Sequence, residues 1–171
     1  MQPIIMMDTR EKEGKKKHIL DEFERRGIKV VRNKIYSGDW TLPTNQSVCI
    51  DTKSCGLPEV YTNLIQKHEA FADECDRARE AGIRLIVLIE DPKIKTLEQV
   101  QNWVNPRSII YQKQVEQGKA TQKAPPVNSK RLYNIMRTMS ENHGVEWAFT
   151  TREKCGETIL ALLGVICDGE T

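Results

Sequence analysis

Apolar and polar positions recur along this chain in two different periods, which predict a mixture of strands and helices. Short apolar runs are typical of strands, and they occur at 4–7, 28–35 and 83–89. Apolar residues spaced three and four apart predict helices at 15–26, 58–81 and 130–142. A last strand is expected at 145–150. This alternation predicts an α/β fold, with a central mixed β-sheet flanked by helices.

Each of the expected helices has a defined apolar face. The helix at 58–81 presents an apolar stripe in which His68 fills the one gap, and the stripe consists of Val60, Leu64, Phe71, Cys75 and Ala78. Because this helix joins two strands, it predicts a right-handed strand–helix–strand crossover. The last helix follows the capping-box pattern at 150–153 and is expected to bury Ile159, Leu162, Leu163 and Ile166.

The stretch S-G-D-W-T-L-P-T-N-Q-S-V-C-I-D-T-K at 37–53 predicts a β-hairpin, because strand-forming residues flank the turn-forming residues 43–46. With the turn centred near Asn45, antiparallel partners sum to about 90, so Asp39 lies opposite Asp51. Lys53 joins the same face because side chains alternate along a strand. Two opposed carboxylates repel each other unless a cation neutralises them, and a divalent cation is the usual one.

Three segments, in this order, carry a pattern that has a chemical meaning: Met7-Asp8-Thr9-Arg10-Glu11, Gly38-Asp39-Trp40 and Asp51-Thr52-Lys53. They resemble the nuclease domain of the ERCC4 (XPF/Mus81-like) family, of the PD-(D/E)xK nuclease superfamily, whose pattern is V-D-x-R-E, G-D-[YW] and E-R-K. The resemblance implies a restriction-endonuclease-like core. It also implies a metal-dependent DNA endonuclease that hydrolyses phosphodiester bonds in branched or flapped DNA. The implied cofactor is Mg²⁺, for which Mn²⁺ can substitute, without any small-molecule cofactor.

The resemblance assigns a role to individual residues of this chain. The expected catalytic residues are Asp39, Asp51, Lys53 and Glu11. The expected metal ligands are Asp39, Asp51, the backbone carbonyl of Thr52, and Asp8. Carboxylate and carbonyl oxygens are the ligands that Mg²⁺ prefers, and the bound cation acidifies a water and polarises the phosphodiester. Lys53 is expected to position the attacking water or to neutralise the developing charge.

Basic residues are concentrated in one part of the chain, although the formal net charge is only +2. The stretch 105–137 contains seven basic residues and one acid, Glu116, which suits a phosphate backbone. The residues expected to contact DNA are Arg10, Lys12, Lys15, Arg107, Lys130 and Arg131. Residues 105–107 are typical of a turn, and 117–128 is rich in Gly, Pro, Gln and Lys. The segment at about 105–130 is therefore predicted to be a basic, mobile loop.

Each of these residues also has a plainer interpretation. Asp39 after Gly38 is compatible with an ordinary turn, and Asp8 and Glu11 are compatible with helix capping. The lysine run at 12–17 is compatible with a solvated helix face. His68 on an apolar stripe is more often a core residue than a catalytic base.

The chain departs from the ERCC4 pattern in three places. Asp51-Thr52-Lys53 lacks the central arginine of E-R-K, and the family's acid four residues after the lysine corresponds to Leu57, with Glu59 as the nearest substitute. The helix-hairpin-helix module that family members usually carry is not expected here. These departures keep two alternatives open. One is a Holliday-junction resolvase or restriction-type nuclease on the same fold. The other is a catalytically silent nuclease fold that acts as a DNA-binding or protein-docking module.

Length and composition exclude several other classes of protein. The 171 residues predict a single ERCC4-type domain, and 39% hydrophobic with 29% charged residues is typical of a soluble globular protein. No apolar run is long enough for a membrane span, and the first residues do not resemble a signal peptide, so a cytoplasmic location is expected. Five cysteines without zinc-type spacing predict that most of the thiols are buried. The resemblance also makes a homodimer, a task in DNA repair or recombination, and a phage origin reasonable expectations.

Overall fold

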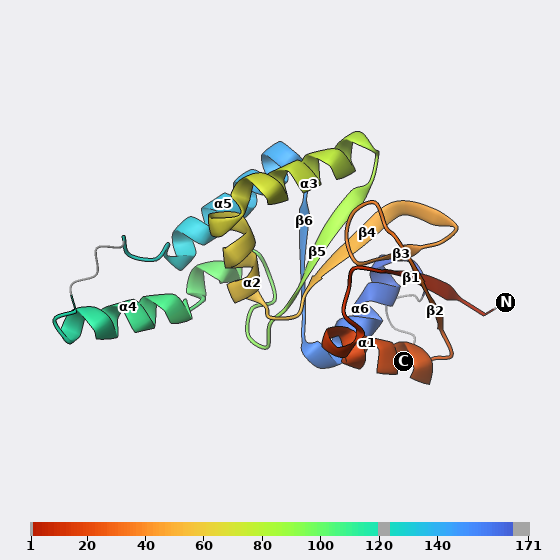
Figure 1. The fold of residues 1–171 in the computed structure, drawn as a ribbon, viewed down its shortest axis with the longest axis horizontal. Helices are drawn as coiled ribbons and strands as arrows, with labels where there is room; N and C mark the ends of the chain where they lie inside the picture. The colour runs from red at the N-terminus through yellow and green to blue at the C-terminus, as the bar shows by residue number, and fades with distance from the viewer. Residues whose placement is uncertain (1, 120–123, 166–171) are drawn as a thin grey trace.

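Six strands form one mixed sheet in the computed structural model, which describes residues 2–119 and 124–165 (Figure 1). The strands are β1 (Ile4–Asp8), β2 (Lys29–Asn33), β3 (Trp40–Leu42), β4 (Asn45–Lys53), β5 (Arg84–Glu90) and β6 (Glu146–Thr150). Their order across the sheet is β2-β1-β3-β4-β5-β6. Only β3 is antiparallel to its neighbours β1 and β4, whereas β1 with β2, β4 with β5, and β5 with β6 pair parallel. The mixed sheet that the sequence predicts is confirmed.

Helices cover both faces of this sheet (Figure 1). The α-helices of the described residues are α1 (Glu13–Arg25), α2 (Leu57–Tyr61), α3 (His68–Glu80), α4 (Pro106–Glu116), α5 (Ser129–His143) and α6 (Cys155–Leu162). Two 3₁₀ helices at Glu98–Asn102 and Arg152–Lys154 and a π-helical turn at Thr62–Gln66 complete the elements. Within residues 2–119 and 124–165, no helix has both the length and the apolar character that crossing a membrane requires.

The sheet separates two apolar cores. Helices α1 and α6 pack on one face, where Phe23 meets Trp40 edge to face at 5.5 Å between ring centroids. Helices α2, α3 and α5 pack on the other face. Successive residues of β5 point alternately into the two cores, so that Ile86 lies in the first and Val87 in the second. This double burial explains the unbroken apolar run of the strand, because a central parallel strand has no solvent-exposed face.

The predicted hairpin forms with the predicted register at its open end. Trp40 pairs with Ile50, so Asp39, one residue earlier, lies across from Asp51. The Asp39 amide donates to the Ile50 carbonyl at 2.8 Å. Near the turn the register shifts, so that Leu42 pairs with Asn45 and strand β4 begins earlier than expected. The Thr41 hydroxyl donates to the Val48 carbonyl at 2.7 Å within this irregularity.

The prediction of a single long helix at 58–81 is wrong. Helix α2 ends after five residues, a π-helical turn follows, and α3 begins only after the bend at Lys67. All five apolar residues of the predicted stripe are buried, but His68 is exposed. The wider π turn and the bend rotate the helix face, which carries His68 out of the stripe. The prediction that His68 fills a gap in the core is therefore wrong.

The segment predicted as a basic loop at about 105–130 begins with helix α4. The Asn105 side chain caps this helix by accepting a hydrogen bond from the Arg107 amide at 3.0 Å, so residues 105–107 start a helix rather than a turn. Helix α4 extends away from the sheet and buries none of its residues (Figure 1). The sequence pattern missed it because a helix without a buried face has no apolar periodicity. Residues 120–123 of the expected loop, and the expected core residue Ile166, lie outside the described residues.

Candidate active site

Residues from β1, β4, α3 and the loops that follow β1 and precede β3 line one cavity of about 260 Å³ near the middle of the sheet. Strands β1 and β4 run in the same direction, and β3 between them runs in the opposite direction. The carboxyl ends of β1 and β4 therefore lie beside the start of β3. This brings Asp8, Asp51 and Asp39 together at one end of these three strands. The residues that line the cavity are Asp8, Arg10, Glu11, Gly38, Asp39, Asp51, Lys53 and Glu74. All four predicted catalytic residues are among them.

Gly38 determines how close Asp39 comes to β4. Its φ is +76°, and a Cβ atom at this position would lie 3.0 Å from the Ile50 carbonyl oxygen. The main chain of Asp39 links the two neighbouring strands, since its amide donates to Ile50 and its carbonyl accepts from the Asp8 amide, each at 2.8 Å. A residue other than glycine would therefore displace the Asp39 carboxylate from the site.

We expect Gly38→Ala to lower the free energy of unfolding by about 1–3 kcal/mol, because alanine is strained at this φ and crowds the Ile50 carbonyl. Gly14→Ala is the matched control, because Gly14 lies in α1, where an added Cβ atom would meet nothing within 4 Å. That change should be neutral or slightly stabilising. Urea unfolding of the two variants measures the difference, and equal stabilities would contradict the assignment to Gly38.

Asp39 and Asp51 each use one carboxylate oxygen for protein contacts. Asp39 Oδ2 accepts hydrogen bonds from the Thr52 amide at 2.9 Å and the Thr52 hydroxyl at 2.6 Å. Asp51 Oδ2 lies 2.7 Å from Lys53 Nζ. Within the described residues, the Oδ1 atom of each aspartate has no hydrogen-bond partner. These two oxygens are thus available to a ligand.

Burial and neighbouring charges shift the pKa values of Asp51 and Lys53. Burial and the nearby Asp39 carboxylate raise the pKa of Asp51 to about 6, although the Lys53 ammonium opposes that shift. Burial disfavours the charged form of Lys53, but the Asp51 and Asp39 carboxylates outweigh it and raise the pKa of Lys53 above its usual value. Lys53 is therefore an ammonium group at neutral pH, which donates hydrogen bonds and cannot accept a proton.

Asp8 is buried with both oxygens already occupied. Its carboxylate accepts from Arg10 Nε at 2.8 Å and Nη2 at 2.9 Å, and from the Arg10 and Ile35 amides at 2.7 and 2.8 Å. Burial alone would raise the pKa of Asp8, but these hydrogen bonds lower it. The contacts indicate that Asp8 orients Arg10 and fixes the chain at Ile35. The predicted role of Asp8 as a metal ligand thus has less support than those of Asp39 and Asp51.

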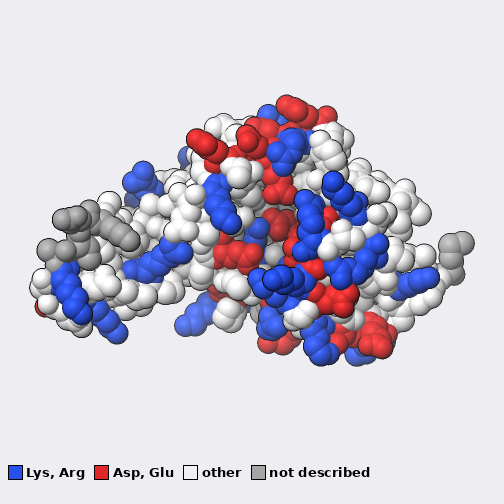
Figure 2. Space-filling model, in the orientation of Figure 1, with Lys and Arg blue, Asp and Glu red and all other residues white. Residues whose placement is uncertain are grey.

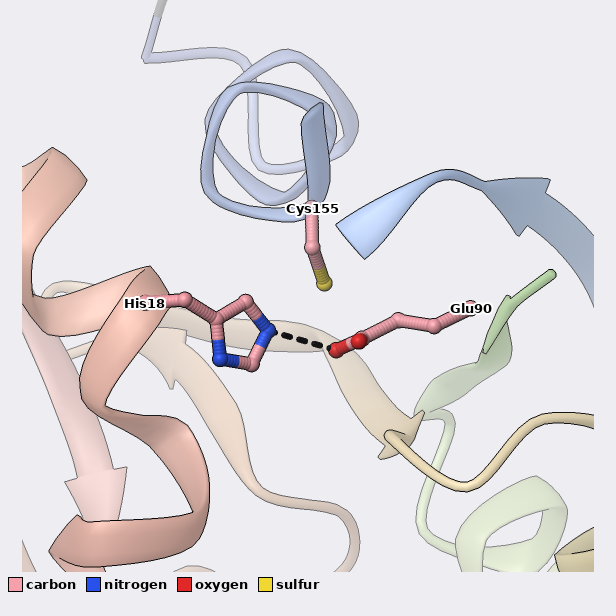
Figure 3. Close-up of side chains that lie close together, drawn as sticks. All are labelled: His18, Glu90 and Cys155. Carbon is pink, nitrogen blue, oxygen red and sulfur yellow. Dashed lines mark hydrogen bonds and ion pairs between the residues drawn. The ribbon is translucent and has the colours of Figure 1, made fainter. Parts of the chain in front are cut away.

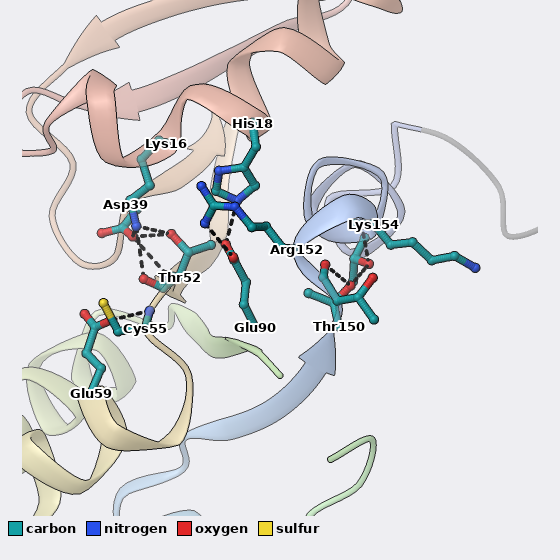
Figure 4. A network of polar contacts seen from close by, with 12 residues as sticks. Lys16, His18, Asp39, Thr52, Cys55, Glu59, Glu90, Thr150, Arg152 and Lys154 are labelled. Atoms are coloured by element: carbon teal, nitrogen blue, oxygen red, sulfur yellow. Dashed lines mark hydrogen bonds and ion pairs between the residues drawn. The ribbon is translucent and has the colours of Figure 1, made fainter. Parts of the chain in front are cut away.

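Sequence reasoning missed Lys16, which belongs to a run of lysines compatible with a solvated face. The Lys16 side chain is only 5% exposed, and its ammonium group contacts Glu11 as well as Asp39 and Thr52. Figure 4 shows the contacts with Asp39 and Thr52. Burial disfavours its charge, but the Asp39 and Glu11 carboxylates raise the pKa of Lys16. A signal was present, because Lys16, Ile19 and Phe23 share the helical spacing of the buried stripe of α1.

An acid that no motif marks completes the site. Glu74 from α3 lines the cavity, and its carboxylate lies 3.4 Å from the Ser37 hydroxyl. The family's missing acid corresponds to Leu57, which is fully buried, and Glu59 instead accepts from the Cys55 amide at 3.1 Å (Figure 4). Glu74 therefore supplies the extra carboxylate to this cavity from a different helix. Only the packing of α3 on the sheet brings it there.

Basic residues lie around the acidic cluster that Glu11, Asp39, Asp51 and Glu74 form. On the face shown in Figure 2, acidic side chains occupy the central depression, and Lys and Arg gather around it. A second cavity of about 540 Å³ beside the cluster is lined in part by Lys15, Lys67 and Arg107. Arg107 also stacks over Tyr61, with 5.1 Å between the guanidinium carbon and the ring centroid.

The other residues expected to contact DNA do not line these two cavities. Arg131 lines a third cavity, of about 390 Å³, together with the exposed His68. Lys12 and Lys130 are exposed and line none of these three cavities. The structure therefore gathers Arg10, Lys15 and Arg107 around the acidic cluster, and does not bring Lys12, Lys130 or Arg131 to the cavities there.

A second polar cluster joins α1, β5 and α6 (Figure 3). His18 Nε2 lies 2.7 Å from Glu90 Oε1, Arg152 contacts the other Glu90 oxygen at 3.4 Å, and Cys155 completes the group. Burial raises the pKa of the Cys155 thiol, and the Glu90 carboxylate acts in the same direction. Because both Glu90 oxygens already have protein partners, these contacts serve to hold the two helices against the end of β5.

The mixed sheet with helices on both faces has the restriction-endonuclease-like fold that the sequence predicts. Two solved structures of XPF from Aeropyrum pernix share this fold, and one of them is a complex with DNA. The complex matches with a TM-score of 0.62 and 15% sequence identity, over 96% of this chain and 64% of that chain. The other structure matches with a TM-score of 0.61 and 18% identity, over 95% of this chain and 64% of that chain.

No family model and no curated protein sequence matches the chain. The chain spans 64% of the length of each XPF structure, and its sequence identity to them is 15% and 18%. At that identity the similarity concerns the fold. It confirms the fold class and the resemblance to the XPF nuclease domain at that level.

Proposed function

We propose that this chain is a metal-dependent DNA endonuclease that hydrolyses phosphodiester bonds. One observation carries the proposal: Asp39, Asp51 and Lys53 converge on one cavity at the carboxyl ends of β1 and β4, in a fold that is shared with XPF. Both aspartates are largely buried, and burying a charged group costs free energy. A catalytically silent module has no use for such a cluster, so the intact cluster favours an enzyme over that alternative.

The donor set suits a hard divalent cation. The Oδ1 atoms of Asp39 and Asp51 would hold Mg²⁺, or Mn²⁺ in its place, with the Glu11 and Glu74 carboxylates at the border of the same cavity. Such a cation, when bound, polarises the phosphodiester and lowers the pKa of a bound water. We include Asp8 among the residues that support the site, through its hold on Arg10, rather than among those that bind the cation.

Lys53 would act as a charged hydrogen-bond donor. Its ammonium group is fixed at 2.7 Å from Asp51 and stays protonated at neutral pH. It would orient the attacking water or stabilise the negative charge that develops on the phosphate. The proton of the water must therefore be accepted by another group, since an ammonium group cannot take it.

DNA would approach over the two cavities. Lys15, Lys67 and Arg107 line the cavity beside the acids, and Arg10 borders the acids themselves. Lysine and arginine side chains neutralise backbone phosphates without reading the base sequence. The finer proposals are a preference for branched or flapped DNA, action as a homodimer, an intracellular location, and a task in DNA repair or recombination.

The function is tested with a panel of labelled substrates: duplex, single strand, 3′ flap, fork and four-way junction. Each is incubated with Mg²⁺, with Mn²⁺ and with EDTA. We expect cleavage in either metal and none in EDTA, because the carboxylates alone cannot activate water. The preferred substrate distinguishes a flap nuclease from a junction resolvase. DNA binding without cleavage of any substrate would instead support the silent DNA-binding module.

Metal affinity should depend on pH through Asp51. With a folded-state pKa of about 6, the carboxylate is mostly ionised at pH 7 and mostly protonated at pH 5. Because the cation binds only the ionised form, we expect Mn²⁺ affinity by titration calorimetry to be about tenfold weaker at pH 5 than at pH 7. Asp51→Asn should lose this pH dependence along with most of its affinity. A wild-type affinity that stays constant over this range would contradict the assignment.

A further inference from the structure

Lys16 is the one lysine of α1 that points into the acidic cluster, and its ammonium group is saturated there. Nζ lies 3.0 Å from Asp39 Oδ2, 3.0 Å from the Thr52 carbonyl oxygen and 2.6 Å from the Thr52 hydroxyl. Glu11 Oε2 follows at 3.4 Å. These acceptors come from three separate parts of the chain, and the ammonium group holds them together. Figure 4 shows its contacts with Asp39 and Thr52.

Two of these acceptors are groups expected to hold the metal. The sequence predicts the Thr52 carbonyl as a ligand and Asp39 as the first carboxylate of the site. In the structure the carbonyl oxygen and one Asp39 oxygen are used by Lys16 instead. A divalent cation cannot share these oxygens with the ammonium group, because two cations in contact repel strongly in a buried site.

Displacement of the Lys16 ammonium group from the acidic cluster would be costly. Its stem lies on the buried face of α1 in line with Ile19 and Phe23, and only 4% of the residue is exposed. The acids around it raise its pKa, so it remains charged. A displaced ammonium group would lose its partners inside the protein, which is far more costly than losing a surface ion pair.

The charges that remain around the cavity match one divalent cation. Asp8 is neutralised by Arg10. Of the other groups, four carboxylates (Asp39, Asp51, Glu11 and Glu74) face two ammonium groups, those of Lys16 and Lys53. This leaves a net charge of about two minus, which one divalent cation neutralises and two would exceed.

We propose that the Lys16 ammonium group acts as a permanent cation of the site, so that the cluster binds one divalent cation, through Asp39 and Asp51 Oδ1 and without the Thr52 carbonyl. The proposal rests on the proposed metal-dependent function and specifies its metal stoichiometry. Lys16 is a positioning residue that takes the place of a second metal ion. Removing its charge would free the Asp39 and Thr52 oxygens for another cation.

The experiment is a titration of the full chain with Mn²⁺, followed by calorimetry and by the electron paramagnetic resonance signal of free Mn²⁺. We compare the wild type, Lys16→Met and Lys16→Arg. Lys17→Met is the matched control, because Lys17 is exposed on the same helix and pairs only with Asp21 among the described residues. We expect one Mn²⁺ per chain for the wild type, Lys16→Arg and Lys17→Met. Lys16→Met should bind a second Mn²⁺, or bind the first roughly tenfold more tightly.

Thermal unfolding separates this role from a merely structural one. Lys16→Met should unfold at lower temperature than the wild type in EDTA, and Mn²⁺ should restore most of the loss, since the metal replaces the missing cation. A loss that Mn²⁺ does not reverse would indicate that Lys16 only supports the fold.

Other outcomes also decide the proposal. Two Mn²⁺ ions on the wild type, or unchanged stoichiometry and affinity in folded Lys16→Met, would overturn it and leave the nuclease proposal intact. If Lys16→Met folds neither in EDTA nor in Mn²⁺, the number of Mn²⁺ ions bound per wild-type chain decides the proposal by itself. No Mn²⁺ binding by the wild type, together with no cleavage of any substrate, would overturn the inference and the proposed function alike.

Discussion

Asp51→Asn is expected to lower the rate of DNA cleavage by roughly a thousandfold or more, because it removes a charged ligand from the proposed cation site. Lys53→Met should lower the rate by roughly a hundredfold to a thousandfold while leaving Mn²⁺ binding in place, because it removes a donor and not a ligand. The two variants therefore separate the metal from the lysine. Initial rates on the preferred substrate, at saturating Mg²⁺, measure both effects.

The matched control for these two variants is Asp21→Asn, which removes an exposed carboxylate that pairs with Lys17 on the outer surface of α1. It should cleave DNA within about twofold of the wild type, since an exposed ion pair contributes little. Circular dichroism must show that Asp51→Asn and Lys53→Met are folded. Folded variants that cleave at the wild-type rate would move the reaction away from this cavity.

The largest effect on stability is expected for Trp40→Ala, at about 3–5 kcal/mol of unfolding free energy. Trp40 is fully buried between the sheet and α1, where it packs edge to face against Phe23. Its indole Nε1 donates to the Thr52 hydroxyl at 3.3 Å, so it also steadies the residue that binds Asp39. Unfolding in urea, monitored by circular dichroism, gives the value.

Two companion variants show which part of Trp40 matters. Trp40→Phe keeps an aromatic ring against Phe23 and should lose only about 1–2 kcal/mol. Tyr36→Ala is the control, since Tyr36 is a large residue that is 60% exposed, and it should change stability by less than about 0.5 kcal/mol. If Trp40→Ala is no less stable than Tyr36→Ala, the core on this face of the sheet does not depend on Trp40.

Much of the fold follows from local patterns. The apolar run at 83–89 predicts a doubly buried strand, and β5 occupies the middle of the sheet between the two cores. The pairing of Trp40 with Ile50 at the open end of the hairpin is the one predicted from a turn centred near Asn45, whereas the register shift beside the observed turn at 43–44 does not follow from that pattern. Helix α4 and the break between α2 and α3 could not be predicted in this way. The first buries no face, and the second depends on how two helices meet the sheet.

The candidate site divides in the same manner. Asp39, Asp51 and Lys53 belong to one hairpin, where pairing and the alternation of side chains determine their arrangement before any helix packs. Asp8 and Glu11 could be assigned to the same site only because their segment resembles the V-D-x-R-E part of the ERCC4 pattern. Glu74 and Lys16 carry no motif, since each reaches the cavity from a helix whose contacts with the sheet are remote in sequence.

The mixed sheet, the pairing at the open end of the hairpin and the position of Asp39, Asp51 and Lys53 beside one another could be predicted from the chain, because they depend on interactions within or between neighbouring segments. Which oxygens remain free for a ligand could not be predicted, because it depends on how the helices pack against the sheet. Asp8 is committed to Arg10, the Thr52 carbonyl to Lys16, and the outer carboxylate comes from Glu74. Those pairings depend on where α1 and α3 dock, and docking is set by side-chain packing across the whole core rather than by any short pattern.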